Sequence, residues 1–294
     1  MQTISEIRAL LNERGLKPKR RLGQNFLYDK NQLAKLIGAA EVKAGDVVLE
    51  VGPGTGTLTE ALLEAGAVVI ACEIDNDLAD LIEDRLGPPD TSRLTLIRGD
   101  CLGKSRTLNP AIIAAIAGRD FKLIANLPYQ IASPLMVALL VDHPNCVAQF
   151  ITIQKEVADR LLATPSTKAY GPLTIITRAF AEVKKIAILK PTCFWPPPKV
   201  DSAMVCLLPS PLGRGAGGEG LPDKGSNRTP PDLSTPAARR AFARFITELF
   251  TKRRKQLGTI FGRGRTFPET ISPDMRPEVL TIEQHIAMWQ AIAK

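Results

Sequence analysis

The chain has 294 residues, of which 45% are hydrophobic and 23% charged, and its formal net charge is +8. That length allows a full core and more than one domain, and the composition is typical of a globular protein. No apolar run approaches the ~20 residues that span a bilayer, and the first residues lack the pattern of a signal peptide. We therefore expect a cytoplasmic protein without a membrane partner.

The cysteines and histidines do not form a metal-binding or disulfide pattern. The five cysteines contain no CxxC pair, and the chain has only two histidines. These numbers argue against a zinc site and against a disulfide framework, so we expect no metal. Most of the cysteines lie in apolar runs, which predicts that they are buried as small hydrophobic side chains.

The basic residues are concentrated in two places. A small group, Lys17, Lys19, Arg20 and Arg21, lies near the N-terminus, and residues 234–265 hold nine basic side chains against one acid. Two basic clusters predict a polyanionic partner, because cationic side chains that neutralise phosphates release condensed counterions. A solubilising surface is the alternative interpretation of these charges.

Residues 46–153 alternate short β-rich runs with stretches of helical periodicity. The predicted strands are 46–51, 67–72, 94–98, 121–125 and 147–153, and the helical stretches include 58–65 and 78–86. This alternation predicts an α/β fold, with a parallel sheet and helices on both faces. Two later runs, 184–190 and 201–208, flank the sequence WPPPK and predict a β-hairpin at one edge of the sheet.

The last third of the chain changes character. Residues 209–236 are rich in Gly, Pro and polar residues, so they cannot bury enough apolar surface to offset chain entropy. Residues 237–257 then show an apolar helical stripe with basic residues on the other faces, and Thr281 with Gln284 predicts a capping box. We predict an α/β domain at 1–208, a flexible linker at 209–236, and a small basic helical domain at 237–294.

The ends of the first three predicted strands carry residues suited to a nucleoside. Gly52, Gly54 and Gly56 follow the first strand, where glycine allows a tight turn and close approach of a ligand. Glu73 ends the second strand, where an acid binds ribose hydroxyls, and Asp100 follows the third, where it can accept from the amine of adenine. Because open α/β sheets bind ligands at this edge, the set predicts an adenosine-containing cofactor.

NAD and S-adenosylmethionine both contain adenosine. The pyrophosphate of NAD favours a helix N-terminus without nearby acids. Glu50 lies directly before the glycine loop, which suits a cationic ligand such as a sulfonium. The sequence therefore favours S-adenosylmethionine, and a dehydrogenase is the more distant alternative.

The fourth strand ends in Asn126-Leu127-Pro128-Tyr129 at the same edge. The side-chain oxygen of Asn126 and the carbonyl of Leu127, whose geometry is restricted by Pro128, can accept both protons of an aromatic amine. Such acceptors localise the nitrogen lone pair toward a methyl donor, and Tyr129 can stack on the base. A strand-to-helix turn with Tyr129 in the core is the structural alternative.

Long blocks of the chain resemble the small-subunit ribosomal RNA adenine dimethyltransferases of the kasugamycin-sensitivity type. The blocks are RRLGQNFLYDKN, LEVGPGTGTLT, NLPY, IQKEVADRLLATPSTKAYGPLTI, FWPPPKVDSAMV and FTKRRKQL. The resemblance implies a Rossmann-like methyltransferase domain with a C-terminal helical domain, and S-adenosylmethionine as the cofactor. It implies that two adjacent adenosines in the 3′-terminal hairpin loop of 16S ribosomal RNA are dimethylated during small-subunit biogenesis.

The resemblance also assigns roles to residues. It implies that Asn25 and Leu27 contact the methionine and sulfonium end of the cofactor, and that Asn126 serves both cofactor and catalysis. It implies Gly52 and Gly54 in the glycine loop, Glu73 on the ribose and Asp100 on the adenine. Tyr129 and Phe194 would flank the two faces of the target base. The implied partner is 16S ribosomal RNA in a 30S assembly intermediate, and we expect a monomer.

Two alternatives to this function remain open at the level of sequence. The large-subunit (23S) ribosomal RNA methylases of the macrolide-resistance type share the fold and an Asn-x-Pro-Tyr-type motif. The other alternative is an RNA-binding ribosome assembly factor without catalysis, against which the intact catalytic residues argue. The match through FWPPPKVDSAMV and the basic tail favours the small-subunit enzyme.

Overall fold

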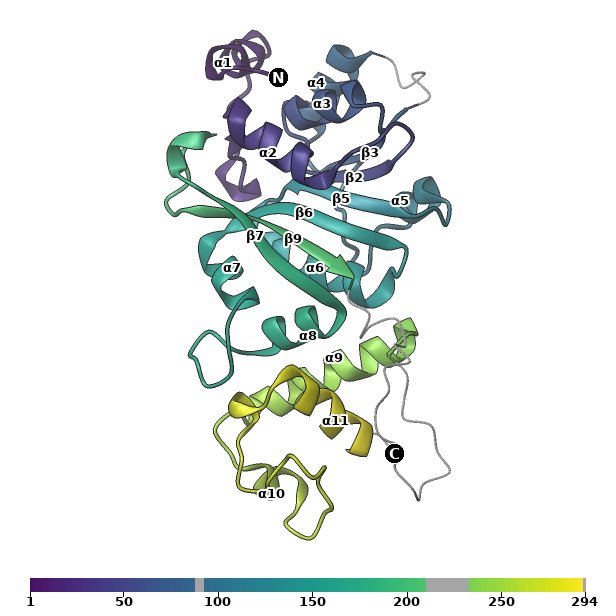
Figure 1. The fold of residues 1–294 in the computed structure, drawn as a ribbon. Helices are drawn as coiled ribbons and strands as arrows, with labels where there is room; N and C mark the ends of the chain where they lie inside the picture. Colours follow the sequence, from purple (N-terminus) through teal and green to yellow (C-terminus); the bar gives the residue numbers. More distant parts are fainter. Residues whose placement is uncertain (88–92, 210–232, 293–294) are drawn as a thin grey trace. The chain divides into compact units, whose positions relative to one another are not determined.

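The computed structural model describes residues 1–87, 93–209 and 233–292 (Figure 1). The chain forms two compact units. Unit 1 comprises Met1–Leu139, Asn145–Ala158 and Lys184–Leu207, and unit 2 comprises Leu140–Pro144, Asp159–Val183 and Leu208–Lys294. Unit 2 thus includes two segments that the sequence-based division placed in the first domain. Most of the predicted linker, 210–232, lies outside the described residues.

A seven-stranded sheet has the strand order β4-β3-β2-β5-β6-β9-β7. Its strands are β2 (Val47–Val51), β3 (Val68–Glu73), β4 (Leu94–Arg98), β5 (Phe121–Asn126), β6 (Cys146–Gln154), β7 (Ala181–Leu189) and β9 (Ser202–Pro209). Strands β2 to β6 pair with one another in parallel, and β9 pairs antiparallel with β6. The predicted α/β class and all five predicted parallel strands are confirmed, and the two later runs lie side by side at the sheet edge.

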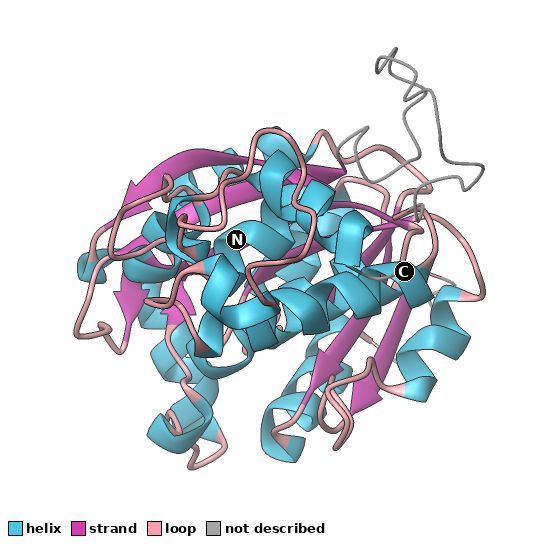
Figure 2. Ribbon diagram, turned by 90° about the horizontal axis from the view of Figure 1, so that it is seen from below, coloured by secondary structure: helices cyan, strands magenta, loops and turns pink. Residues whose placement is uncertain are grey.

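The helices of the α/β region alternate with these strands (Figure 2). They are α1 (Ile4–Glu13), α2 (Lys30–Ala40), α3 (Thr57–Glu64), α4 (Asn76–Leu86), α5 (Pro110–Ile116), α6 (Tyr129–Asp142) and α7 (Lys155–Leu161). Helix α3 packs against β3, α4 and α5 pack against β3 and β4, and α2 packs against β5 and β6. Strand β2 is buried along its whole length, as a parallel strand covered on both faces must be.

Short elements complete unit 1. They are the 3-10 turns η1 (Arg20–Leu22) and η2 (Pro191–Cys193) and the strands β1 (Phe26–Leu27) and β8 (Phe194–Trp195). Strands β1 and β8 form a separate antiparallel pair that joins Leu27 to Phe194 and Phe26 to Trp195. The FWPPP segment therefore lies beside residues 19–27, which we call the N-terminal arm, although Phe194 follows its partner Leu27 by 167 positions.

Unit 2 is helical. Its elements include α8 (Pro172–Phe180), α9 (Pro236–Thr251), α10 (Leu257–Phe261), η4 (Pro277–Val279) and α11 (Ile282–Ile292). Helices α8, α9 and α11 contact one another, and Phe242, Ile246 and Leu249 of the predicted stripe are buried. The predicted capping box is confirmed, because Gln284 N–H donates to Thr281 Oγ1 at 3.2 Å and Thr281 N–H donates to Gln284 Oε1 at 2.9 Å.

All five cysteines are buried, as expected from the apolar runs in which most of them lie, and none forms a disulfide. Among the described residues, no helix has the length and apolar content to cross a bilayer.

Candidate functional site

The strand order places the candidate site. The chain leaves β2 toward β3 and β4 on one side and later returns to β5 on the other, so β2 and β5 flank the topological switch point. Crevices at the carboxyl ends of strands at such a point are where doubly-wound sheets bind ligands. A pocket opens there, lined by residues that follow β2, β3, β4 and β5 and by the N-terminal arm.

The glycine loop forms the floor of this pocket with a left-handed backbone. Gly52 has a φ of 72° and Gly54 a φ of 63°. A Cβ at Gly54 would lie 2.9 Å from the Phe26 ring, and one at Gly52 would lie 3.2 Å from Pro128. Both positions therefore require glycine for backbone conformation and for space. The loop touches both the N-terminal arm and the segment after β5.

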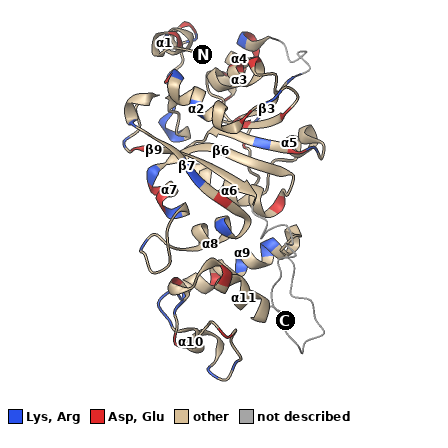
Figure 3. Cartoon of the chain, viewed as in Figure 1, with Lys and Arg blue, Asp and Glu red and all other residues tan. Residues whose placement is uncertain are grey.

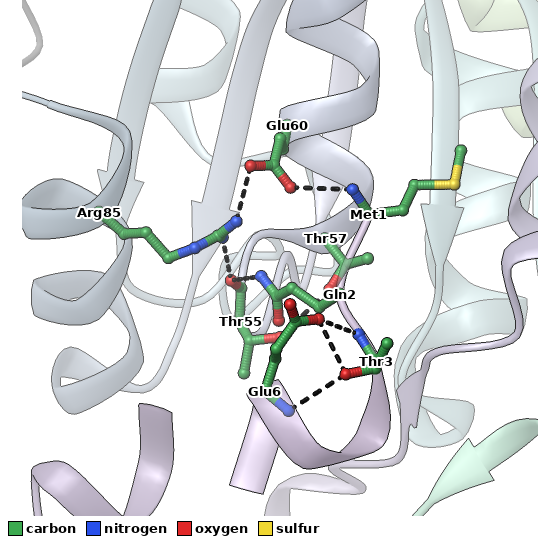
Figure 4. A network of polar contacts seen from close by, with 8 residues as sticks. All are labelled: Met1, Gln2, Thr3, Glu6, Thr55, Thr57, Glu60 and Arg85. Carbon is green, nitrogen blue, oxygen red and sulfur yellow. Dashed lines mark hydrogen bonds and ion pairs between the residues drawn. The ribbon is translucent and has the colours of Figure 1, made fainter. Parts of the chain in front are cut away.

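Gln2, which lies just before α1, and Arg85 of α4 support the loop (Figure 4). The carbonyl of Thr55 accepts from Gln2 Nε2 at 2.9 Å and from Arg85 at 2.8 Å, and Arg85 also pairs with Glu60 at 2.8 Å. Thr3 and Glu6 form a capping box at the start of α1. These contacts fix a carbonyl that has no strand partner, so the loop is held in one conformation.

Two carboxyl groups at the pocket are buried. Glu73 is 4% exposed, and its oxygens accept the N–H groups of Gly54 at 3.1 Å and Asp75 at 2.9 Å. Glu50 is 2% exposed and accepts from Thr59 Oγ1 at 2.6 Å. Desolvation raises the pKa of both groups, and it raises the pKa of Glu50 to about 8, with a further contribution from the Glu73 charge.

Asp100, in contrast, is exposed at the rim of the pocket. Its Oδ1 accepts the N–H of Leu102 at 2.9 Å, which fixes the side chain on the loop after β4. This bond forms an Asx-type turn and uses one of the roughly four lone-pair sites of the carboxylate. Asp100 can therefore accept further hydrogen bonds from a ligand in the pocket.

The end of β5 presents two acceptors. Asn126 Nδ2 donates to the carbonyl of Asn25 at 2.9 Å, which fixes the amide orientation. Within the described residues, no hydrogen bond reaches Asn126 Oδ1 or the carbonyl of Leu127. The N–H of Leu127 donates to the carbonyl of Thr152 at 3.2 Å, so the backbone here is held by β6 while its carbonyl remains an available acceptor.

Tyr129 lines the pocket and is anchored through its hydroxyl. The hydroxyl lies 2.7 Å from Ser202 Oγ, and Ser202 is fully buried on β9. Burial raises the pKa of Tyr129, so the phenol is neutral at physiological pH. The ring is partly exposed, which fits a face available for stacking rather than a side chain in the core.

The arm brings Asn25 and Leu27 to the pocket, but β8 does not bring Phe194 there. Asn25 and Leu27 are both lining residues. Phe194 is 2% exposed and pairs with Leu27 across the β1–β8 ladder, so its ring is covered by protein. The assignment of Phe194 to one face of the target base therefore stays a prediction, because its ring does not line the pocket in this structure.

Comparison with known proteins identifies the family. The family model described as ribosomal RNA adenine dimethylase matches residues 15–212. A ribosomal RNA small subunit methyltransferase A from Streptomyces griseus is 34% identical over 97% of this chain and 92% of its own length. One from Magnetococcus marinus is 36% identical over 97% and 95%. The chain belongs to the ribosomal RNA adenine dimethylase family.

Solved structures agree with this assignment. A dimethyladenosine transferase from Plasmodium falciparum has a TM-score of 0.59 and 29% identity over 81% of this chain and 75% of its own. The 23S rRNA methyltransferase ErmE has a TM-score of 0.61 and covers 92% of this chain and all of its own, at 22% identity. That second likeness shows the methyltransferase fold alone. The resemblance seen in the sequence is thus confirmed, together with the Rossmann-like fold.

The pocket of this dimethylase suits the family cofactor, S-adenosylmethionine. Gly52 and Gly54 let the loop pass close to Pro128 and Phe26 at the pocket, and the buried carboxyl of Glu50 has no cation beside it among the described residues. A cationic ligand would favour the ionised form of that carboxyl. Glu73 and Asp100 would hold the ribose and adenine, and Asn25 and Leu27 the methionine end.

Several residues at the dimethylase pocket were not predicted from the sequence. Phe26 packs on the glycine loop, Ser202 anchors Tyr129, and Gln24 with Asp75 links the arm to the turn between β3 and α4. Phe26 and Gln24 lie within the quoted block RRLGQNFLYDKN, and Ser202 lies within FWPPPKVDSAMV, so those blocks contained the signal. Asp75 had no signal beyond its position two residues after Glu73.

Figure 3 colours Lys and Arg blue, and the basic residues of 237–265 fall into two groups by their contacts. Arg239 is 8% exposed and donates to the carbonyls of Leu233 at 2.9 Å and Leu140 at 2.8 Å. Arg240 pairs with Asp142, and Arg253 pairs with Glu278 at 2.6 Å. The second group is exposed and forms no ion pair with a described residue: Arg244, Lys252, Arg254, Lys255, Arg263 and Arg265.

Proposed function

We propose that this protein dimethylates the N6 amines of two adjacent adenosines in the 3′-terminal hairpin loop of 16S ribosomal RNA, with S-adenosylmethionine as donor. One observation carries the proposal. Asn126 Oδ1 and the Leu127 carbonyl are free acceptors at the same sheet edge as the glycine loop, Glu73 and Asp100. This arrangement places the site for an amine beside the site for an adenosine-containing cofactor.

The chemistry follows from the two acceptors. The lone pair of an adenine amine is delocalised into the ring and is a weak nucleophile. Asn126 Oδ1 and the Leu127 carbonyl accept the two N6 protons and hold them so that the lone pair localises on nitrogen. When bound, the cofactor would supply an electrophilic methyl group, and its sulfur would keep the electron pair of the broken carbon–sulfur bond and leave as a thioether. The methylated nitrogen is acidic and loses a proton to water, so the site needs no strongly basic side chain.

The pocket also has to hold a base outside its helix. Tyr129 offers a ring face, and the hydrogen bond between its hydroxyl and Ser202 keeps that face in one orientation. Stacking on an aromatic ring replaces part of the stacking that an adenosine loses when it is extruded. Tyr129 therefore acts in this proposal as a binding residue for the target base and carries no proton.

The partner in this proposal is 16S ribosomal RNA within a 30S assembly intermediate, bound by a monomeric enzyme in the cytoplasm without a metal. The exposed cations Lys252, Arg254 and Lys255 of unit 2 support an RNA partner, because they are available to phosphates. The basic helical segment 237–294 serves as the RNA-binding part. Arg253 contributes to the fold instead, since its guanidinium is paired.

The large-subunit methylases are the second candidate, because the fold of one of them, ErmE, matches 92% of this chain. The observations favour the small-subunit function. The relatives that match nearly the full chain at 34–36% identity carry the small-subunit name, whereas the likeness to ErmE is at 22%. A non-catalytic assembly factor would not need the free acceptor pair at Asn126 and Leu127.

The test is a methylation assay with two substrates. The protein is incubated with radiolabelled S-adenosylmethionine and either unmethylated small subunits or unmethylated large subunits. The RNA is then digested and the labelled nucleoside is identified and mapped by primer extension. We expect dimethyladenosine at two adjacent positions of the small-subunit RNA. Label only in large-subunit RNA, or no label in either, would contradict the proposal.

A further inference from the structure

Asp75 occupies an unusual position beside the pocket. It lies two residues after Glu73, and its side chain is only 4% exposed. Its backbone N–H donates to Glu73 Oε1 at 2.9 Å, and its Oδ1 caps α4 by accepting the N–H of Asp77 at 3.2 Å. Asp75 therefore directly adjoins the carboxyl group expected to bind the ribose.

The side chain of Asp75 also fastens the N-terminal arm. Oδ1 accepts from Lys19 Nζ at 2.6 Å, and Oδ2 accepts from Gln24 Nε2 at 2.7 Å. The Oε1 of Gln24 in turn accepts the backbone N–H of Lys19 at 2.7 Å. Both ends of the segment 19–24 are thus held on one buried carboxylate, which closes the segment into a loop.

The same arm reaches the catalytic strand end. Asn25 directly follows Gln24, and its carbonyl accepts from Asn126 Nδ2 at 2.9 Å. A continuous series of hydrogen-bonded or adjacent residues therefore runs from Glu73 through Asp75, Gln24 and Asn25 to Asn126. The Nδ2 bond determines which atom of the Asn126 amide is free for substrate, so the position of the arm bears on both sites.

A helix cap alone does not explain these contacts. The cap uses one oxygen of Asp75, whereas the other oxygen is bonded only to Gln24 among the described residues. Burying a carboxylate is unfavourable unless it is paired, and the Lys19 and Gln24 contacts lower the pKa of Asp75 against the effect of burial. The carboxylate is therefore arranged to receive the arm.

We propose that Asp75 is a positioning residue that fixes the Lys19–Asn25 arm over the cofactor pocket and thereby sets the affinity for S-adenosylmethionine. This inference rests on the proposed function for the identity of the ligand. It is not a catalytic role, because Asp75 acts through Gln24 and Glu73. Loss of the arm contact lowers cofactor affinity more than it lowers the turnover number.

Two substitutions isolate the contact. Asp75→Asn keeps the size and the capping oxygen Oδ1, but it replaces Oδ2 with an NH2 group that faces the donor Gln24 Nε2. Gln24→Met keeps the length of the side chain and leaves the α4 cap intact. The matched control is Asp77→Asn, because Asp77 is the second acid on Lys19 at 2.6 Å but its side chain is 50% exposed and touches neither Gln24 nor Glu73.

The measurements are the dissociation constant of S-adenosylmethionine by calorimetry without RNA, and KM and kcat in the methylation assay. We expect Asp75→Asn and Gln24→Met each to weaken cofactor binding and raise KM about tenfold, with kcat changed less than about threefold. The double variant should bind the cofactor no more weakly than the weaker-binding single variant, because both substitutions remove the same contact. Asp77→Asn stays within about twofold of wild type, as an exposed ion pair should. Hydrogen exchange of residues 19–25 is faster in the first two variants.

Each outcome decides the matter. If Asp75→Asn does not fold, Gln24→Met tests the inference by itself, because it leaves Asp75 and its cap on α4 unchanged. Weakened binding in Asp75→Asn with normal binding in a folded Gln24→Met would show that Asp75 does not act through Gln24 and would overturn the inference. Unchanged binding in both variants would overturn it as well. If wild-type protein failed to bind S-adenosylmethionine at all, the proposed function itself would fail.

Discussion

Burial favours the uncharged form of Glu50 in unit 1 and of His285 in unit 2, and the two groups differ in what surrounds them. Burial raises the pKa of Glu50 to about 8 in unit 1 and lowers the pKa of His285 to about 4 in unit 2. Glu50 lines a pocket at the sheet edge. His285 is fully buried against Tyr170 and Phe250. A perturbed pKa therefore indicates a binding site only where the group borders an open pocket.

The basic residues of the two units show a similar contrast. Lys19 of the arm forms ion pairs with Asp75 and Asp77, although its place in the N-terminal basic cluster predicts a contact with phosphate. In unit 2, Arg239 is committed to carbonyls and lies 5.2 Å from the Phe180 ring centre, whereas Lys252 and Arg254 are exposed. Net charge predicts a polyanion partner for the whole protein but does not say which side chains meet it.

The largest effect is expected at the acceptor pair of unit 1. Asn126→Ala removes one of the two amine acceptors, so we expect kcat to fall about 10³-fold, by analogy with loss of a preorganised hydrogen-bonding group at a reacting centre. RNA affinity stays unchanged, because the basic residues of unit 2 are untouched. Single-turnover methylation and filter binding measure the two quantities. Methyl transfer at the wild-type rate in this variant would show that the reacting centre lies elsewhere.

Glu50 predicts a pH dependence of stability for the protein without cofactor. Between pH 4.5 and about 8 the unfolded chain has lost this proton while the folded chain retains it. The unfolded state thus binds fewer protons, and the free energy of unfolding falls by a few kcal/mol as pH rises through this range. Urea titrations at several pH values measure it. Glu50→Gln, which keeps an acceptor for Thr59, should remove this part of the dependence.

His285 predicts the opposite response in unit 2. Below pH 6.5 the unfolded chain gains a proton that the folded chain takes up only near pH 4. The free energy of unfolding therefore falls by up to about 3 kcal/mol as pH drops from 6.5 to 4. Hydrogen exchange in α9 and α11 reports this loss. His285→Leu should reduce it, while His143→Gln, at the half-buried second histidine, should have a smaller effect.

Arg239 separates fold from RNA binding. Arg239→Ala leaves the carbonyls of Leu233 and Leu140 without their donors, so we expect a loss of about 2–3 kcal/mol in the stability of unit 2. Thermal unfolding, monitored by hydrogen exchange in α8 and α9, measures the change. Arg244→Ala, on an exposed part of the same helix, is the control and should change stability by less than about 0.5 kcal/mol.

The smallest effect is expected from the exposed cations. Replacing Lys252, Arg254 and Lys255 by Gln should weaken RNA binding by roughly tenfold and reduce the salt slope by up to about 3, with the melting temperature unchanged. Binding titrations at several salt concentrations measure both quantities. An unchanged salt slope would show that these residues do not contact phosphates and that the RNA-binding surface lies elsewhere.

The sequence predicted those parts of the site that local pattern determines. Strand periodicity, glycine spacing and the residue at each strand end depend on neighbours in the chain, and they placed Gly52, Glu73, Asp100 and Asn126 at one sheet edge, as the structure has them. Contacts between distant segments have no such local signal. The Asp75–Gln24 bond spans 51 positions, so no spacing rule predicts it.

Long-range contacts also explain the differences. Phe194, which the resemblance places beside the target base, is covered by the pairing of β8 with the arm, a contact between distant segments. Unit 2 includes 159–183 because α8 packs on α9 and α11, which local composition does not reveal. Charge spacing likewise does not distinguish Arg239, which is buried by packing, from the exposed Arg244.

The central claim is that Asn126 and the Leu127 carbonyl receive the amine of an extruded adenosine. A crystal structure of the protein with S-adenosylhomocysteine and an unmethylated hairpin RNA tests it most directly. We predict the N6 atom of one loop adenosine about 3 Å from both Asn126 Oδ1 and the Leu127 oxygen, with the base stacked on Tyr129. An extruded base bound away from these atoms, or an Asn126 amide turned toward another partner, would contradict the account.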